Sequence, residues 1–435
     1  MTEKDSRRSI IREYFRSLDL SSTLRCFFFL YLIYTCANIM GIYILEFTLG
    51  PRIGVELPEP KENITRNLVE GYGYPFESHD VISGSGYILT LHRIPHGIKK
   101  KHWKTLNRPV ALFQHGLVAS SDAFLFRGPD FDLPYTLADA GYDVWLSNMR
   151  GNVYSRKHKT MDSTKDLQFW DFTLHEIGVQ DYPAIFDYIL NKTKQQDLYF
   201  LGHSVGSTAG FILCSAMPQY NKKIKLHLSL APLVYVNHSI TLAQKMLIFP
   251  GLSVMETAMS NGIYNCFPRR PFFSRMMQMI CEDGMIFQRL CLKAVFTVVG
   301  QKNSQFNTSY LPSCFEYFPA GTSMFLMQHT LQLYVKGDFS PFDYGNETHN
   351  MQKYNESIPA PYNLSMVTHP VLLYYGSGDI LVTEEDIIST LQKLPNSLGK
   401  FQVPFENFNH MDFMWGKDAK ELLYDKLIVM MDKYR

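Results

Sequence analysis

The stretch Asp197–Met217, DLYFLGHSVGSTAGFILCSAM, decides the fold. DLYFL is typical of a buried strand and STAGFILCSAM of a helix. Between them, residues 202–206 (GHSVG) match G-x-S-x-G, the pattern of a sharp strand-to-helix turn that exposes a serine hydroxyl. Glycines are needed there because the flanking strand and helix approach closely. This setting predicts that Ser204 is a nucleophile; the alternative is a glycine-rich turn with a spectator serine.

Outward from this turn, short apolar runs alternate with helical segments, which is typical of a largely parallel sheet covered on both faces. A Ser-Gly-Ser turn joins the first two runs as a hairpin. The predicted strands are 76–82, 86–94, 109–114, 142–147, 197–201, 225–230, 370–376 and 400–405. The predicted helices are 133–140, 177–191 and 207–217, one opening near Thr383, and one from about Lys417.

The alternation stops after Pro232 and resumes at Pro370, as it would if an insertion interrupted a single sheet. We therefore expect an α/β-hydrolase fold, with a mostly parallel central sheet and helices on both faces. The core would comprise residues 46–234 and 364–435. Residues 235–363 would form an inserted, mainly helical cap or lid.

A serine hydroxyl needs a base, and the base needs a group that holds its tautomer. In this fold the order is serine, acid, histidine. Asp379 lies just past the strand PVLLYY, where active-site groups of open sheets gather. His410 lies in the loop after the last strand, whereas His369 precedes the acid and His203 would point away from the serine oxygen. We predict Asp379 as the acid and His410 as the general base.

An oxyanion hole needs two preorganised backbone donors. The N–H of Val205, after the nucleophile, is one, and the N–H of Leu117, after the strand PVALFQ, is the other. His115 is expected to shape that turn. No metal or other cofactor is expected, because Val179 breaks the H-E-x-x-H pattern that His175 begins and there is no C-x-x-C.

Bulk composition excludes some classes of partner. Charged residues make up 19% of the chain and the net charge is +1, so there is no basic excess of the kind that nucleic acid attracts. The seven cysteines are too few for a disulfide-built scaffold. Cys281 and Cys291 are close in sequence and can close a short loop in an oxidising compartment.

Residues 26–45 form a 20-residue apolar stretch without charge, long enough to cross a bilayer as a helix. Six basic residues precede it, and only Arg52 and Lys61 occur in the 20 residues after it. This bias predicts a signal anchor with residues 1–25 in the cytosol and a lumenal or extracellular catalytic domain, as in a type II membrane protein. The alternative is a cleaved signal sequence and a secreted or lysosomal protein.

Seven sequons support translocation, since each fits the N-glycosylation pattern of a surface loop. Their asparagines are Asn63, Asn191, Asn237, Asn307, Asn346, Asn355 and Asn363.

At these residues the sequence resembles the acid lipase family, which includes gastric and lysosomal acid lipases. The shared motifs occur in order through the core and the predicted cap, and they cover nearly the whole chain after its first 50 residues. They are 72–75 (YGYP), 80–95, 114–121 (QHGLVASS), 148–158 (NMRGNVYSRKH), 169–184, the serine turn, 305–312 (QFNTSYLP), 319–323 (PAGTS), 376–379 (GSGD) and 409–413 (NHMDF).

The resemblance implies a cap with a mobile lid and the hydrolysis of triacylglycerols or sterol esters in an acidic or digestive compartment. By motif position it implies a triad of Ser204, Asp379 and His410, with Leu117 and Val205 as oxyanion donors.

The resemblance also supports a Cys281–Cys291 bridge. Two residues depart from the family pattern: Val205 stands where Gln is usual, and Ser207 where Thr, Gly or Ala is usual. Because Val205 would donate only its backbone N–H, the oxyanion hole is expected to survive, but substrate preference does not carry over safely.

The leading hypothesis is therefore a lipase that acts at a lipid–water interface. Two alternatives remain: an esterase or acyltransferase that uses the same triad on smaller acyl esters, and a catalytically inactive lipid-binding relative.

Overall fold

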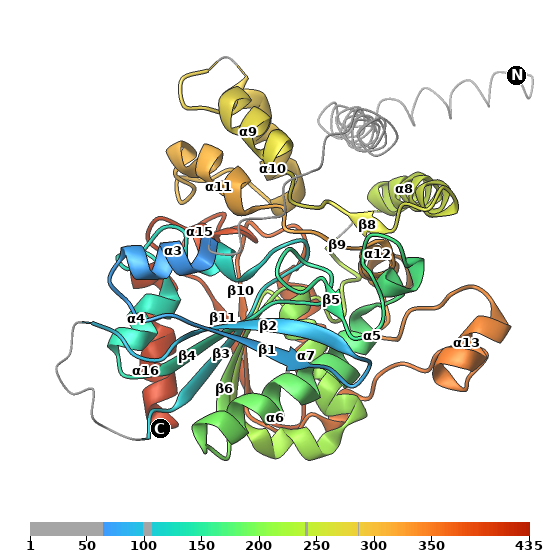
Figure 1. Ribbon diagram of the computed structural model, residues 1–435, viewed down its shortest axis with the longest axis horizontal. Coiled ribbons are helices and arrows are strands. Elements are labelled where there is room, and N and C mark those ends of the chain that lie inside the picture. The colour runs from blue at the N-terminus through green and yellow to red at the C-terminus, as the bar shows by residue number, and fades with distance from the viewer. Residues whose placement is uncertain (1–63, 99–106, 240–241, 286) are drawn as a thin grey trace, which may run out of the picture. The chain divides into compact units, whose positions relative to one another are not determined.

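The computed structural model describes residues 64–98, 107–239, 242–285 and 287–435 (Figure 1). The predicted cytosolic segment 1–25, the apolar stretch 26–45 and Asn63 lie outside these ranges. Within the described ranges, no helix has the length and apolar character needed to span a bilayer.

A mixed sheet forms the centre of the described chain, with strand order β1-β2-β4-β3-β6-β7-β10-β11 and β5 paired to β2. β1 and β2 form the predicted antiparallel hairpin, β2 is also antiparallel to β4, and every pair from β4 to β11 is parallel. The strands are β1 Glu77–Ile82, β2 Tyr87–Ile94, β3 Val110–Gln114, β4 Asp143–Ser147, β5 Lys157–His158, β6 Leu198–His203, β7 Ile224–Leu230, β10 Val371–Tyr375 and β11 Ser397–Gln402.

Helices cover both faces of this sheet, as two neighbouring residues of β6 show. Side chains of successive strand residues point to opposite faces. The hydroxyl of Tyr199 donates to the backbone of Met431 in the last helix, whereas the ring of Phe200 packs against Phe186. The α-helices that flank the sheet are α3 Ile64–Gly71, α4 Leu133–Asp139, α5 Leu174–Glu176, α6 Tyr182–Thr193, α7 Val205–Ala216, α14 Glu384–Leu391, α15 Asp412–Trp415 and α16 Asp425–Lys433.

Between β7 and β10 the chain is mainly helical, as predicted. A two-stranded ribbon, β8 Asn265–Cys266 with β9 Thr322–Ser323, is its only sheet among the described residues. Its helices are α8 Leu242–Ser260, α9 Pro271–Ile280, α10 Gln288–Val299, α11 Leu311–Tyr317, α12 Met324–Lys336 and α13 Glu347–Tyr354. The exact domain boundaries at 234/235 and 363/364 stay predictions.

The chain divides into two compact units, residues 1–57 with 241–257 and residues 58–240 with 258–435. Of the first, the described residues include only the greater part of α8. The second contains the sheet and every predicted site residue.

The sequence placed most core strands within one or two residues, and the bounds of the last strand were wrong. The last strand is Ser397–Gln402 rather than 400–405, because this edge strand alternates half-buried and exposed residues and so carries no apolar run. The terminal helix, predicted from about Lys417, starts as a π-turn at Lys420 and continues as α16, and the separate short helix α15 before it was not predicted. A turn of π-helix also joins α5 to α6, so this region begins at Leu174 instead of 177.

Candidate active site

Ser204 lies at the turn between β6 and α7, with φ +56° and ψ −133°. Backbone held in such sparsely populated regions costs on the order of 1–3 kcal/mol and clusters at functional sites. Gly202 makes the turn possible, because a Cβ there would lie 2.4 Å from the Cα of Ser207. The glycine pattern thus reflects close packing of strand against helix, as the sequence predicted.

Asp379 and His410 are 31 residues apart in the sequence but lie side by side in the structure. The Asp379 Oδ2 lies 2.8 Å from the His410 Nδ1, and both side chains are buried. The other carboxylate oxygen accepts the N–H groups of Leu381 at 2.8 Å and Val382 at 3.1 Å. These bonds fix the carboxylate, so that it can hold the imidazole with its proton on Nδ1 and leave Nε2 free to accept.

Two further glycines allow the loops that carry Asp379 and His410 to touch. A Cβ on Gly376 would lie 2.1 Å from the carbonyl oxygen of Phe408, and one on Gly378 would lie 2.2 Å from that of Asn407. The Gly378 N–H also donates to Phe408 at 2.9 Å. The glycines of the motif GSGD therefore allow Asp379 to lie against the loop that carries His410, called the base loop below.

The Leu117 loop lies directly against the serine turn. A Cβ on Gly116 would lie 3.1 Å from the Cβ of Ser204, and one on Gly206 would lie 2.4 Å from the carbonyl oxygen of His115. Val205 begins α7, where the first N–H groups have no partner within the helix. The Leu117 N–H donates to no other described residue. Two backbone donors are thus available beside Ser204.

His115 and His203 hold these loops. The His115 Nδ1 lies 2.8 Å from the carbonyl oxygen of Gly116, and its Nε2 accepts the N–H of Met149 at 3.2 Å. The His203 Nε2 donates to the carbonyl oxygen of His410 at 3.0 Å. Burial lowers the pKa of His115 to about 4 and that of His203 well below its usual range, so both rings stay neutral.

Comparison with known proteins agrees with this geometry. Residues 65–128 match the partial alpha/beta-hydrolase lipase region, and residues 109–247 match the alpha/beta hydrolase fold. The chain is 34% identical to human gastric triacylglycerol lipase over 93% of this chain and 99% of that one, and 38% identical to Lipase 1 of Drosophila melanogaster over 84% and 79%. The chain belongs to the acid lipase family.

Other family members are similarly related, among them human Lipase member K, which is 35% identical over 87% of this chain and 92% of that protein. A soluble variant of yeast monoglyceride lipase overlaps 87% of this chain and 98% of its own with a TM-score of 0.49 at 13% identity. That overlap is too low to bear on substrate or mechanism.

In this acid lipase, residues 299–303 belong to the segment between β7 and β10. They form hydrogen bonds with the loops that carry Asp379 and His410. The carbonyl oxygen of Val299 accepts the N–H of His410 at 3.1 Å, and the Gln301 N–H donates to Gly378 at 2.9 Å. The Asn303 side chain donates to the Asp412 carboxylate at 2.6 Å. Sequence reasoning missed these residues. Their contacts lie far along the chain, and no periodic pattern in the sequence indicates them.

Asp412 is a second buried carboxyl beside the triad. Its Oδ2 also accepts the N–H of Asn409 at 2.7 Å, while Oδ1 has no partner among the described residues. Burial raises the pKa of Asp412 to about 6. Its hydrogen bonds fix the turn that presents His410.

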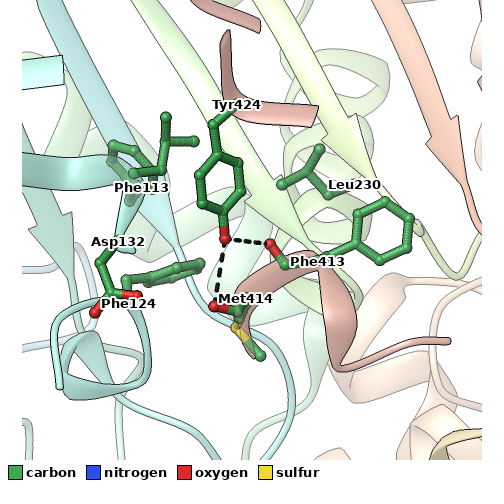
Figure 2. Close-up of a pocket in the computed structure, with 8 residues that line it drawn as sticks. Phe113, Phe124, Asp132, Leu230, Phe413, Met414 and Tyr424 are labelled. Carbon is green, nitrogen blue, oxygen red and sulfur yellow. Dashed lines mark hydrogen bonds between the residues drawn. The ribbon is translucent and has the colours of Figure 1, made fainter. Parts of the chain in front are cut away.

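A small cavity lies beneath the base loop, between β3, β7 and α15 (Figure 2). The hydroxyl of Tyr424 points into it and donates to the carbonyl oxygens of Phe413 at 2.8 Å and Met414 at 3.3 Å. Burial raises the pKa of Asp132, on the cavity wall, to about 6, although Arg127 opposes that shift. Phe413 and Met414, which follow His410 in the chain, form one wall of this cavity.

Cys281 and Cys291 form the predicted disulfide, with an S–S distance of 2.10 Å between the end of α9 and the start of α10. Cys214 and Cys314 are buried and carry free thiols, and Cys266 is also buried. In the described ranges, no group of three or more His, Cys, Asp or Glu side chains is arranged to hold a metal ion.

Proposed function

We propose that this acid lipase is a carboxylic ester hydrolase that cleaves triacylglycerols or sterol esters through an acyl-enzyme on Ser204. The observation that carries the proposal is the 2.8 Å contact of the His410 Nδ1 with Asp379, beside a strained serine turn. That arrangement matches the roles of base, orienting acid and nucleophile.

In the acylation step, the Ser204 Oγ attacks the ester carbonyl carbon and the His410 Nε2 takes its proton. The Asp379 carboxylate stabilises the resulting imidazolium. The oxyanion accepts hydrogen bonds from the Leu117 and Val205 N–H groups. As the tetrahedral intermediate collapses, His410 returns the proton to the departing alkoxide, and the alcohol leaves.

In the second half, His410 takes a proton from water, and the hydroxide attacks the acyl carbon of the Ser204 ester. Collapse expels the serine oxygen, which regains a proton from His410. The products are a free fatty acid and the original enzyme, so no cofactor is consumed.

A lipid substrate is supported by the surface of α9 and α10, the helices joined by the disulfide. Phe272 is 66% exposed, Met279 70%, Phe287 53% and Leu290 55%. Large exposed apolar side chains that gather on one face mark binding surfaces. The relatives' own names, gastric triacylglycerol lipase among them, point to the same substrate class. We propose that residues 235–363 act as the cap that admits a lipid to Ser204.

We further propose that the catalytic domain is translocated and N-glycosylated. The apolar stretch 26–45 would act as a signal anchor, or as a cleaved signal sequence in a secreted or lysosomal protein. All six described sequon asparagines are exposed, as glycan attachment requires: Asn191, Asn237, Asn307, Asn346, Asn355 and Asn363. The disulfide is consistent with an oxidising compartment.

Fluorophosphonate labelling of wild type and Ser204→Ala tests the enzyme. We expect label on the wild type alone, and a fall in kcat of about 10⁴-fold or more in the variant. Equal labelling of both proteins would contradict the proposal and favour an inactive lipid-binding relative. Activity on a long-chain triacylglycerol emulsion, compared with a soluble short-chain ester, then tests the substrate class. Preference for the soluble ester would favour the esterase alternative.

A further inference from the structure

The Leu117 loop contains a strained residue that its own sequence does not explain. Val118 has φ +52°, in the left-handed region that β-branched residues rarely adopt. Contacts from elsewhere must therefore hold it. The N–H of Ala320, in the segment between β7 and β10, donates to the Val118 carbonyl oxygen at 2.7 Å, and the Asn152 side chain donates to that of Ala119 at 3.3 Å.

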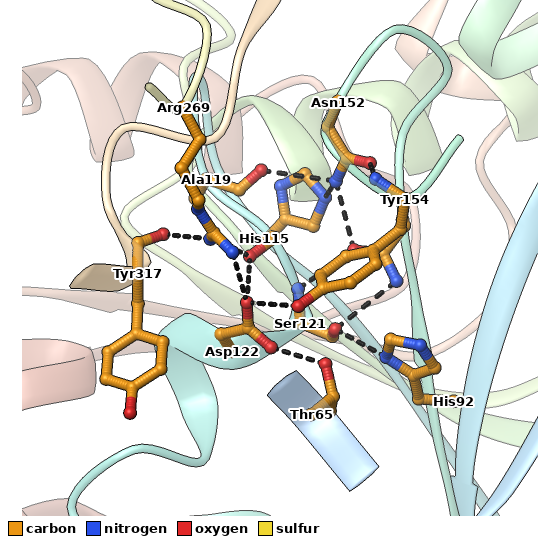
Figure 3. Close-up of polar contacts among 12 residues, drawn as sticks. Thr65, His92, His115, Ala119, Ser121, Asp122, Asn152, Tyr154, Arg269 and Tyr317 are labelled. Carbon is orange, nitrogen blue, oxygen red and sulfur yellow. Dashed lines mark hydrogen bonds and ion pairs between the residues drawn. The ribbon is translucent and has the colours of Figure 1, made fainter. Parts of the chain in front are cut away.

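The end of the same loop is held by Arg269, which also belongs to the segment between β7 and β10 (Figure 3). The Arg269 Nη1 donates to the Asp122 Oδ2 at 3.0 Å, and Nη2 donates to the Ser120 Oγ at 3.1 Å and to the carbonyl oxygen of Tyr317. The side chain of Asp122 is fully buried and that of Arg269 is 5% exposed. One guanidinium thus binds two residues of the loop and the end of α11.

The carboxylate of Asp122 accepts hydrogen bonds from three further side chains. Tyr154 donates to its Oδ2 at 2.7 Å, Ser120 to the same oxygen at 3.2 Å, and Thr65 of α3 to Oδ1. The planar fork of an arginine can donate to Asp122 and Ser120 at once, which the single ammonium of a lysine does less well. Arg269 is therefore one of four residues that hold Asp122, and the one that comes from the segment between β7 and β10.

The ion pair between Arg269 and Asp122 attaches the segment between β7 and β10 to the Leu117 loop, close to Ser204. Leu117, whose N–H is the proposed oxyanion donor, is three residues before Ser120, and Gly116 lies against Ser204 on the other side. The loop is thus held between the serine turn and Arg269. A shift at Ser120 passes through the strained Val118 to the Leu117 N–H.

We infer that Arg269 is a positioning residue for the oxyanion hole, and this rests on the proposed function of Ser204. It holds the Leu117 N–H where the oxyanion forms, through Ser120, Asp122 and the strained Val118. Residues 235–363 therefore complete the catalytic machinery in addition to covering it.

The test compares wild type, Arg269→Lys and Arg93→Lys as full-length proteins. Arg93 is the matched control, since it forms a two-point ion pair with Asp143, at 2.8 and 2.7 Å, at the opposite, amino-terminal end of β4. The readouts are kcat and KM on a soluble short-chain ester, the melting temperature, and Ki for an alkylboronic acid. A boronic acid bonds its boron to the Ser204 Oγ as the serine proton passes to His410, and an oxygen of the tetrahedral adduct occupies the oxyanion hole.

We expect Arg269→Lys to lower kcat and to raise the boronic acid Ki, each by about 10- to 100-fold, with KM changed by less than about threefold. Arg93→Lys should leave kcat and Ki at wild-type values. Should Arg269→Lys fail to fold, the double variant Arg269→Met with Asp122→Asn leaves no unpaired buried charge and should show the same losses.

The inference is overturned if the folded Arg269 variant keeps the wild-type kcat and Ki, or if Arg93→Lys lowers both by the same factor. Failure of the proposed function is a separate result, because the wild type itself would then show no turnover that depends on Ser204.

Discussion

The serine turn and the Leu117 loop meet at Ser204, yet they are held in opposite ways. The turn is set by neighbours in sequence: Gly202 packs on Ser207, and the Ser207 N–H donates to the Ser204 carbonyl oxygen at 3.0 Å. The loop takes its shape from residues far along the chain, such as Asn152 and Arg269. The proposed nucleophile is therefore encoded locally, whereas the proposed oxyanion hole depends on the assembled fold.

Gly206→Ala should have the largest effect, because it acts where the two regions touch. The added Cβ would lie 2.4 Å from the backbone oxygen of His115 and 2.7 Å from that of Gln114, so the loop must move away from the turn. A displacement of about 1 Å costs on the order of 100-fold in rate, and we expect kcat on a soluble ester to fall by about that factor.

Gly71→Ala is the control for this variant, since nothing lies within 4 Å of the position of its added Cβ. Steady-state kinetics and thermal melts of both variants check the prediction. If Gly206→Ala kept wild-type kcat while remaining folded, close contact between turn and loop would not matter for turnover.

Asn152→Ala should disturb the loop alone. The buried amide nitrogen of Asn152 donates to Ala119 at 3.3 Å and to Asn148 at 3.0 Å, and its oxygen accepts the N–H of Tyr154 at 3.0 Å. Unsatisfied buried groups cost about 1–3 kcal/mol, which should appear in the free energy of unfolding. We expect kcat to fall about tenfold as well, less than complete loss of an oxyanion donor would cause.

Asn221→Ala separates these two effects. Asn221 is an equally buried asparagine that bonds to the backbone of Thr368 and Met366, before β10 at the other end of the sheet. It should lose similar stability, measured by denaturant titration, with kcat unchanged. Equal losses of kcat in both variants would mean that the loop responds only to general destabilisation.

The same contrast explains how much could be predicted from sequence. Ser204 and Asp379 each lie in a short motif at a strand end that contains the glycines needed for close approach, and His410 lies in the loop after the last strand. The alternation of apolar runs with helical segments predicted a largely parallel sheet but not the order of its strands, in which β4 lies between β2 and β3. Arg269 and Gln301 gave no such signal. Arg269 acts as a single side chain and Gln301 through its backbone N–H, and neither belongs to a motif with a recognisable spacing.

A buried polar chain lies between α7 and β7, and it includes Ser207, where the family usually has Thr, Gly or Ala. The Ser207 Oγ lies 2.6 Å from the Ser229 Oγ and 2.9 Å from the His227 Nε2. The His227 Nδ1 lies 3.4 Å from the His369 Nε2, and the His369 Nδ1 donates to the Asn221 side-chain oxygen at 2.9 Å. With both rings neutral, each nitrogen has one donor or acceptor role to fill.

His369→Gln should have the smallest effect on activity at neutral pH and a distinct effect on stability in acid. Burial lowers the pKa of His369 to about 3, against about 6.5 when unfolded, so below pH 6.5 the unfolded chain binds a proton that the folded chain does not. Its contribution is therefore full above about pH 6.5 and falls by up to about 1.4 kcal/mol per pH unit as the pH drops toward 3. Glutamine does not titrate, so the variant should be less stable by about 1 kcal/mol at pH 7, for lost hydrogen bonds, and should become more stable than the wild type in acid.

Denaturant titrations between about pH 7 and about pH 4 check this, because each group other than His369 contributes equally to both proteins. Parallel stability curves would contradict it and would mean that His369 is protonated within the fold. A crossing would instead show that His369 stays neutral within the fold while the unfolded chain takes up a proton.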